Sequence, residues 1–199
     1  MRLEKASTKA IKYAIMNFHY SKSVPMVQSA FSVFNDDDEW CGVICYAIGA
    51  NNVLAKSFGL PNGAVAELVR VALNGKQGTT SKAVSISMRI IKKHSPLIRL
   101  LVSYADTEQG HEGIIYQASN WIYCGNSQAA DEYMFQGKRW HGRSFRSSHG
   151  SHTQYTEKEL QIISGSVKLK YIYPLDKSLI PMCKKLSKPY PKKQSAVIV

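Results

Sequence analysis

Residues 67–81 have the sequence ELVRVALNGKQGTTS and join a predicted strand to a predicted helix through a glycine-bearing turn. Residues 67–73 are rich in Val and Leu, which is typical of a strand. Residues 81–94 carry apolar side chains at the spacing of an amphipathic helix. Glycine lets the backbone approach an anion and a helix N-terminus presents free N–H groups, so the turn is a candidate phosphate cradle. An ordinary helix cap at Thr79 or Thr80 is the alternative.

The segments on both sides of this stretch supply further predicted elements. Alternating apolar residues indicate strands, and apolar residues three or four apart indicate helices. The predicted order is a helix at 3–17, strands at 27–34 and 40–50, a loop at 51–63, a strand at 98–105, a short helix at 113–121, strands at 121–124 and 168–173, mostly irregular chain at 125–160 and an extended arm from 181. This order predicts an α/β (α+β) fold with a mixed, mainly antiparallel, twisted sheet flanked by helices.

Length and composition limit the class of protein. The chain has 199 residues, of which 44% are hydrophobic and 20% charged, which favours one globular domain. No apolar run approaches the ~20 residues of a membrane span, and the first residues lack the apolar core of a secretion signal. The four cysteines show no spacing typical of a zinc site, so reduced thiols are expected. We therefore expect a cytoplasmic protein that does not interact with a membrane.

The charge is distributed unevenly along the chain. Residues 1–133 contain 13 basic and 11 acidic residues, whereas residues 134–199 contain 13 basic and 3 acidic residues. A nearly neutral body followed by a strongly basic last third indicates a polyanionic partner, and double-stranded DNA is the first candidate. For the lysines between 184 and 193 alone, a solvated tail is the simpler interpretation.

The segment 138–146, KRWHGRSFR, combines arginines with aromatic residues. Arginine binds phosphate through two parallel hydrogen bonds, and aromatic faces accept unstacked bases. His149 and His152 follow, but no third ligand stands at a useful spacing, which favours a solvated loop that contacts DNA over a metal site. The predicted DNA-binding residues are Lys138, Arg139, Trp140, Arg143 and Arg146.

The order of strand, glycine turn, helix, strand and later helix resembles the GNAT acyltransferase superfamily over roughly residues 1–125 and the last strand. In that superfamily the turn holds the pyrophosphate of coenzyme A, and the later helix lies beside its pantetheine. Here Thr80 stands where a second small residue of the turn would fall. The resemblance implies that acetyl-coenzyme A is bound by Lys76, Gln77, Gly78, Thr79 and Thr80.

Four shorter pieces carry a narrower resemblance. They are HYSKSVP at 19–25, ELVR at 67–70, SYAD at 103–106 and GHEGIIYQA at 110–118. In this order they resemble the Mom family of phage DNA-modification proteins over roughly residues 15–125. That family has a GNAT-like fold and converts adenine in duplex DNA to its N6-carbamoylmethyl form, which protects phage DNA from restriction. The resemblance also implies iron, and the matching functional positions are His19, Tyr20, Arg70, Asp106 and Tyr116.

Asp106 follows a predicted buried strand, at a position where sheet clefts commonly open. It is a candidate to bind a metal or to take a proton from the exocyclic amine of adenine, and the alternative is a turn or cap aspartate. His19 and Tyr20 follow the first helix, and an imidazole with a phenolate suits iron. A surface position is the alternative for His19. The predicted metal ligands are therefore His19, Tyr20 and Asp106, and Tyr20 and Asp106 are also candidate catalytic residues.

Arg70 and Tyr116 complete the candidate catalytic residues. Arg70 lies in an otherwise apolar strand and is a candidate to bind a phosphate or carboxylate. The alternatives are a solvent-facing side chain and a structural pair with Glu67. Tyr116 is a candidate proton donor or stacking surface on the later helix, and a core tyrosine is the alternative. Tyr46 is a weaker candidate for the same pocket.

Three functions remain open from the sequence. The first is an enzyme that converts adenine in duplex DNA to N6-carbamoylmethyladenine. The second is a GNAT acyltransferase that uses acetyl-coenzyme A on a small amine or a protein lysine. The third is a non-catalytic DNA-binding protein on a GNAT scaffold. We expect one catalytic domain at 1–180 with a basic insertion at about 125–160, and a basic extended tail at 181–199; the oligomeric state is open, with a homodimer among the options.

Overall fold

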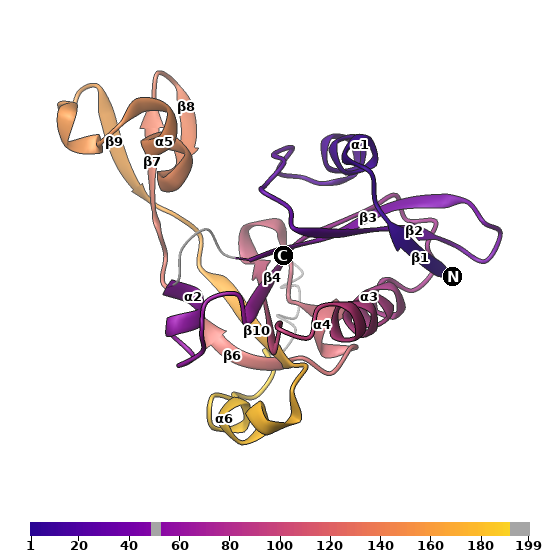
Figure 1. Ribbon diagram of the computed structural model, residues 1–199. Coiled ribbons are helices and arrows are strands. Elements are labelled where there is room, and N and C mark those ends of the chain that lie inside the picture. The colour runs from indigo at the N-terminus through magenta and orange to yellow at the C-terminus, as the bar shows by residue number, and fades with distance from the viewer. Residues whose placement is uncertain (49–52, 192–199) are drawn as a thin grey trace, which may run out of the picture.

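The computed structural model describes residues 1–48 and 53–191, and the side chain of Arg143 is not described. Two sheets are present in this part of the chain (Figure 1). The elements are β1 (Arg2–Lys5), α1 (Thr8–Phe18), β2 (Ser29–Phe34), β3 (Trp40–Ile48), α2 (Val53–Lys56), β4 (Val65–Leu73), α3 (Thr80–His94), β5 (Leu100–Asp106), α4 (Ile114–Gln117), β6 (Ile122–Asn126), β7 (Asp131–Phe135), β8 (Lys138–His141), α5 (Gly142–His149), β9 (Leu160–Ser164), β10 (Lys168–Pro174) and α6 (Ile180–Lys185), with short 3-10 helices at Thr107–Gln109, His152–Gln154 and Lys177–Leu179.

The larger sheet has seven strands in the order β1-β2-β3-β4-β5-β10-β6. Every neighbouring pair is antiparallel except β4 and β5, which are parallel. The α3 helix begins at Thr80 and buries Ala83, Val84 and Met88 on one face of this sheet. The α1 helix, capped by Ser7, buries Ala14 and Ile15 on the other face, so the two helices lie on opposite sides of the sheet (Figure 1). The predicted fold class is confirmed.

Gly113, which precedes α4, occupies a position that only glycine fits. Its φ is +75°, and an added Cβ would lie 2.3 Å from the ring of Tyr171. The close approach brings the first turn of α4 against β10 and places Tyr116 beside Tyr171, with ring centroids 5.1 Å apart. The sharp turn at Gly113 therefore sets the position of a candidate site residue.

The β4 strand contains a bulge that explains its arginine. Tyr46 pairs with Leu68 and Cys45 pairs with Arg70, so Val69 is the extra residue on β4. Residues two apart on a regular strand face the same side, but a bulge reverses this relation. Leu68 therefore faces the core beneath α3, whereas Arg70 lies on the side of α1, near Cys45.

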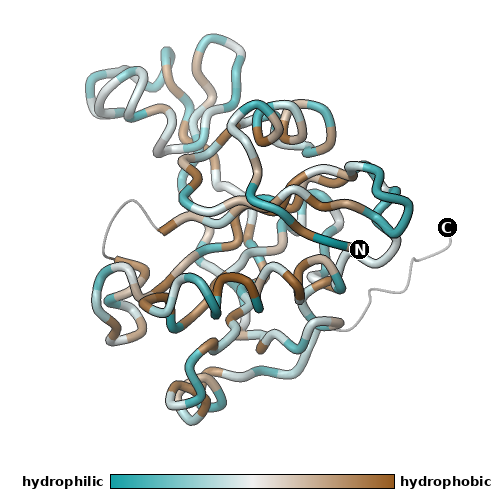
Figure 2. Tube along the Cα trace, turned by 45° about the vertical axis from the view of Figure 1, so that its right-hand side comes forward, coloured by the Kyte–Doolittle hydropathy of each residue, from teal (hydrophilic) through white to brown (hydrophobic). Residues whose placement is uncertain are grey.

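The smaller sheet has three strands in the order β8-β7-β9 and is covered by α5. Its core consists of four buried side chains, and its trace is mostly hydrophilic at the top left of Figure 2. The prediction of mostly irregular chain at 125–160 is therefore wrong. Its buried residues are Tyr133, Phe135, Phe145 and Leu160.

Other local predictions also need correction. The N-terminal helix begins at Thr8, because residues 2–5 pair with β2 as an additional strand. Residues 53–56 form a helical turn inside the predicted loop. The predicted extended arm begins with α6, whose Cys183 is buried, and Tyr190 donates a hydrogen bond to the carbonyl of Trp121 (2.7 Å). Residues 49–52 and 192–199, to which the strand, loop and arm predictions also extended, lie outside the described residues.

Candidate active site

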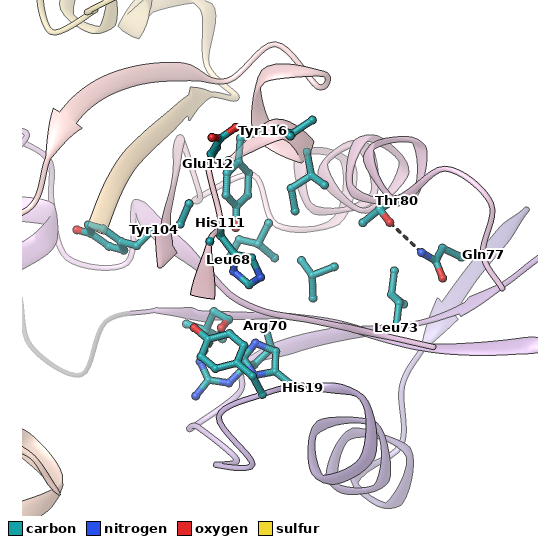
Figure 3. A pocket seen from close by; sticks show the side chains of 18 of the residues that line it. His19, Leu68, Arg70, Leu73, Gln77, Thr80, Tyr104, His111, Glu112 and Tyr116 are labelled. Atoms are coloured by element: carbon teal, nitrogen blue, oxygen red, sulfur yellow. Dashed lines mark hydrogen bonds between the residues drawn. The ribbon is translucent and has the colours of Figure 1, made fainter. Parts of the chain in front are cut away.

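The candidate site lies where β4 and β5 separate. Their parallel pairing covers only residues 65–67 and 100–102, after which the two strands diverge. A cavity of about 400 Å³ opens beyond this point and is lined from both faces of the sheet. His111 and Tyr116 line one side of the cavity, and Arg70 and His19 line the other (Figure 3).

The structure brings together the candidate residues from distant segments. His19, Tyr20, Arg70 and Tyr116 all line this cavity, and the Tyr20 hydroxyl donates a hydrogen bond to Oδ2 of Asp106 (3.2 Å). The sequence placed these residues on separate elements, and their convergence depends on the separation of β4 from β5. The site therefore contains a phenol and a carboxylate in direct contact at a cavity.

Asp106 is buried and held on several sides. Its Oδ1 accepts hydrogen bonds from the Glu108 N–H (3.1 Å) and the Ser166 hydroxyl (3.3 Å). Its Oδ2 accepts the Tyr20 hydroxyl and lies 3.7 Å from the Lys168 ammonium. The Glu108 contact is the turn role that the sequence left as an alternative, but the carboxylate also keeps its contact with Tyr20. Asp106 therefore both caps the turn that follows β5 and contacts Tyr20 at the edge of the cavity.

Tyr20 stays protonated in this environment. Burial raises the pKa of its phenol to about 12, and the Asp106 carboxylate contributes to the rise. The phenol is consequently a hydrogen-bond donor near neutral pH and not a phenolate. Its ring stacks on His19 with centroids 4.4 Å apart and meets His111 edge-on at 5.6 Å.

His19 is a neutral imidazole whose Nδ1 is already engaged. Burial lowers the pKa of His19 to about 4, and the positive charge of Arg70 adds to the decrease. Its Nδ1 accepts the Ser21 N–H (3.2 Å), so the proton of the neutral ring is assigned to Nε2. Binding of a metal by His19 and Tyr20 would have to displace the protons from Nε2 and from the phenol. Within residues 1–48 and 53–191 no group of three His, Cys, Asp or Glu side chains could hold a metal ion, so the structure does not support the expected iron site.

Arg70 holds a loop of its own chain. Its Nε and Nη2 donate to the Ser23 carbonyl (3.3 and 3.1 Å), and its Nη1 donates to the Val69 carbonyl (2.7 Å). The guanidinium also lines the cavity. The side chain is therefore not a purely solvent-facing group, because it binds the Ser23 carbonyl in the loop that carries His19 and Tyr20.

Tyr116 combines the two interpretations that the sequence left open. Its ring is buried in the core beneath α3, yet it also forms part of the cavity wall. Its hydroxyl oxygen lies 2.8 Å from the Ser103 hydroxyl, and burial raises the pKa of Tyr116 to about 12. Tyr46, the weaker candidate, is fully in the core and bonds to Ser87 (2.6 Å), so its predicted place in the pocket is wrong.

The predicted phosphate cradle is only partly at the cavity. Gln77 and Thr80 line it, and the Gln77 amide donates to the Thr80 hydroxyl (2.8 Å). Thr79 is the cap residue of α3, but its side chain makes no capping hydrogen bond. Lys76 pairs with Glu39 (3.5 Å), and neither Lys76 nor Gly78 is among the residues that line the cavity.

The predicted DNA-binding residues lie on β8 and α5, and the two aromatic residues of this segment contribute to the core of the smaller sheet. Phe145 is completely buried, and Trp140 packs against this core with the Lys138 ammonium 4.3 Å above its ring. Arg139 pairs with Glu108 (2.9 Å) and with Glu132. Phe145 therefore has no open face for an unstacked base, whereas the DNA-binding role expected of Trp140 stays a prediction.

The two histidines of the smaller sheet are also part of its packing. His149 contacts the Phe145 ring with centroids 5.1 Å apart, and its buried Nε2 has no hydrogen-bond partner among the described residues. The His152 ring stacks on Tyr133 (5.4 Å). The expected solvated loop at this position is consequently wrong.

Sequence reasoning missed three polar side chains that line the cavity. They lie in the two motifs that were quoted for the family resemblance, so the signal was present but was assigned to other residues. His111 is the most notable, because it brings a second imidazole to the cavity (Figure 3), and its ring meets the Tyr20 ring edge-on with centroids 5.6 Å apart. The three are Tyr104, His111 and Glu112.

Comparison with solved structures shows the class of fold. A protein described as a candidate phosphinothricin N-acetyltransferase aligns with a TM-score of 0.53 and 11% identity, covering 88% of this chain and 99% of that one. A variant of the spermidine N-acetyltransferase of Vibrio cholerae aligns with a TM-score of 0.51 and 9% identity, covering 92% and 99%. The chain therefore has the fold of the GNAT acyltransferases.

Comparison of sequences shows the family. A model of the Mom protein family matches residues 1–192, and this chain belongs to that family. The methylcarbamoylase Mom of Escherichia phage Mu is 27% identical over an alignment of 148 residues that covers 71% of this chain. The match covers 60% of that relative's length. No helix in the described part of the chain has the length and apolar character needed to cross a membrane.

Proposed function

We propose that this chain modifies adenine in duplex DNA to N6-carbamoylmethyladenine and thereby protects DNA from restriction. The observation that carries the proposal is the Tyr20–Asp106 hydrogen bond at the edge of the cavity, in a chain of the Mom family. The name of the phage Mu relative, a methylcarbamoylase, supports this type of group transfer. For a phage-encoded enzyme, the place of action would be the cytoplasm of the host cell.

Asp106 is the proposed acceptor of the amine proton. The lone pair of the adenine amine is delocalised into the ring, so the amine is a poor nucleophile until its proton is removed. In the proposed step the N6–H proton passes to Asp106 Oδ2, and N6 forms a bond to the methylene carbon of an electrophilic carbamoylmethyl donor. The bond between that carbon and the leaving group breaks, and the leaving group keeps the electron pair.

The neighbouring side chains are proposed to position this carboxylate and the substrate. Tyr20 donates to Oδ2 and fixes its direction, because its raised pKa keeps the phenol protonated. Arg70 is a positioning residue, since it holds the Ser23 carbonyl and therefore the segment that carries His19 and Tyr20. Tyr116 is proposed to form the wall against which the reacting group packs.

Coenzyme A is the cofactor that the GNAT fold implies, and the cavity offers a partial fit. The first turn of α3 contains no acidic residue; Thr80 in this turn and Gln77 just before the helix line the cavity. A helix N-terminus of this kind suits an anionic pyrophosphate. We therefore propose that Gln77 and Thr80 would hold acetyl-coenzyme A, which supplies an activated thioester when bound.

A conventional acyltransferase is the second candidate function, and the fold neighbours favour it. Both structures compared above are named as N-acetyltransferases. In this reading the cavity would accept a small amine or a protein lysine, with Asp106 in the same role of proton acceptor. A non-catalytic DNA-binding scaffold would instead bind DNA without forming any product.

Nucleoside mass spectrometry of plasmid DNA tests the proposal. Cells would make the wild-type chain, the Asp106→Asn variant, or the control Asp37→Asn, whose carboxylate lies in an exposed turn. Removal of a general base typically lowers a rate by about 10²–10⁴-fold. We therefore expect a modified adenosine with wild type and control but not with Asp106→Asn, provided that all three proteins fold.

The competing functions give different results. Unmodified DNA from cells with folded wild-type protein would contradict the proposal. Turnover of acetyl-coenzyme A on amines by that protein would then favour the acyltransferase. DNA binding that is equal in wild type and Asp106→Asn, with no product from either, would favour the scaffold.

A further inference from the structure

The loop between α1 and β2, residues 19–28, exposes apolar side chains beside the candidate site. Met26 is 82% exposed and Val24 is 46% exposed, with Pro25 between them. Single exposed apolar residues are common on protein surfaces, so exposure alone indicates little. Their position is informative, because the same loop carries His19 and Tyr20 into the cavity.

The loop is fixed at several points along its length. The Tyr20 hydroxyl bonds to Asp106, and the Arg70 guanidinium binds the Ser23 carbonyl through two nitrogens. The Gln28 N–H donates to the Tyr46 carbonyl (2.9 Å), which attaches the far end to β3. Residues 24–26 are therefore the part of the loop between fixed points, and they are held next to the cavity without being covered by it.

The surroundings of this loop favour an anionic partner. Residues 5–35 contain four lysines and no acidic residue. Lys9, Lys12 and Lys22 of this stretch are exposed. The smaller sheet, with the exposed Lys138 and Arg146, stands on the same side of the large sheet as α1 (Figure 1). A DNA duplex at the cavity would thus meet positive charge from both segments.

We propose that Val24, Pro25 and Met26 enter the base stack of duplex DNA and fill the gap left by an extruded adenine; this inference rests on the proposed function. The amine of a paired adenine is inaccessible within the duplex, so the base must leave the stack before it can react. Proteins that open a base step commonly insert apolar side chains, including Met and Pro. Residues 24–26 supply such side chains beside the cavity that would receive the base.

The test uses the double variant Val24→Ser, Met26→Ser. Leu97→Ser is the matched control, because Leu97 is 81% exposed and also adjoins a proline, but lies at the far end of α3. Sixteen duplexes would each carry 2-aminopurine in place of one adenine. They would differ in the two bases that flank it, so that every combination of neighbours is tested. Fluorescence of this base rises when it unstacks, and plasmid modification would be measured in parallel by mass spectrometry.

We expect wild type and Leu97→Ser to raise the fluorescence in at least one duplex and to modify the plasmid. The double variant should lose about tenfold or more of both signals, since nothing would fill the opened step. Placing 2-aminopurine opposite an abasic position removes the pairing cost, so it should restore most of the fluorescence change.

Other results separate the two proposals. If the double variant gives the same fluorescence change and the same modification as wild type, residues 24–26 do not insert into the base stack. The proposed function would still stand. A plasmid left unmodified by the wild-type protein would remove the proposed function itself. Light scattering would measure the mass of each variant in solution. A lower oligomer mass for the double variant would show that residues 24–26 join two copies of the chain, which would also contradict their insertion into DNA.

Discussion

The two sheets reach a folded state by different means. The large sheet buries long runs of Val, Ile and Leu on both faces under α1, α2, α3 and α6. The smaller sheet relies on three aromatic rings and one leucine, which come from β7, α5 and β9. A sequence that is polar overall can thus form a sheet when a few large side chains converge, because each aromatic ring buries a large area.

The sharpest test of this difference is Phe145→Ala. Phe145 is fully buried and touches Tyr133, Phe135 and Tyr155, with ring centroids 4.9 to 5.6 Å apart. A buried Phe→Ala change costs about 3–5 kcal/mol, which is large for so small a core. We expect the smaller sheet to unfold while the large sheet keeps its structure. Hydrogen exchange should therefore lose protection in β7 and keep it in β4.

Ser144→Ala, at an exposed neighbouring position on α5, serves as the control and should change neither region. Simultaneous loss of protection in β4 would show that the two sheets fold as one cooperative unit. That result would contradict the separation of the two cores.

The strands and helices of the large sheet were predictable where periodicity was strong. The α3 helix and β4 follow from spacing alone, whereas β1 was missed because its four residues continue into a helical pattern. The smaller sheet did carry one readable signal. Gln136 and Gly137 both have positive φ and join β7 to β8, as in a two-residue hairpin turn. Pro181 was likewise compatible with a helix, because it lies in the first turn of α6.

The candidate site was less predictable than the fold. Asp106 could be assigned from its place at the end of a buried strand, but its contact with Tyr20 joins residues 86 positions apart. The direction of Arg70 depends on a bulge at Val69, which the apolar pattern of β4 does not reveal. At Arg139 the sequence shows the arginine but not its two carboxylate partners, and its predicted contact with DNA stays a prediction.

The pH dependence of stability should separate His19 from the surface histidines. Burial lowers the pKa of His19 to about 4 from an ordinary 6.5, so the unfolded chain binds a proton that the folded chain does not. The neutral His19 ring therefore contributes to the stability of the folded chain, and this contribution is complete above pH 6.5 and is lost as the pH falls from 6.5 towards 4. His19 should therefore add about one proton to the slope of the unfolding free energy against pH in this range, and His19→Gln should lower the slope by that amount.

The control is His94→Gln, whose ring is exposed at the end of α3. This change should leave the slope in place. An unchanged slope in His19→Gln would mean that the imidazole is as accessible to protons in the folded chain as in the unfolded one. The effect concerns a single proton and is expected to be smaller than the loss caused by Phe145→Ala.

The smallest expected effect concerns the ion pairs that connect the two sheets. Arg139 on β8 pairs with Glu108, which follows Asp106, and with Glu132 on β7. All three side chains are at least partly exposed, and such pairs contribute about 0–1 kcal/mol, less at high salt. Unfolding of Arg139→Gln should differ little from wild type. A loss comparable to that of Phe145→Ala would show that the smaller sheet depends on this contact.

The same arginine distinguishes charge that is already paired from charge that is available to DNA. Arg146 is exposed on α5, whereas two carboxylates occupy the guanidinium of Arg139. If DNA binds this surface, Arg146→Gln should reduce the salt slope of binding by about one phosphate contact, and Arg139→Gln should reduce it by less. Fluorescence anisotropy over a range of salt concentrations measures both slopes. Equal losses would show that DNA displaces Glu108 and Glu132 from Arg139, so that binding releases the smaller sheet from the segment that follows Asp106.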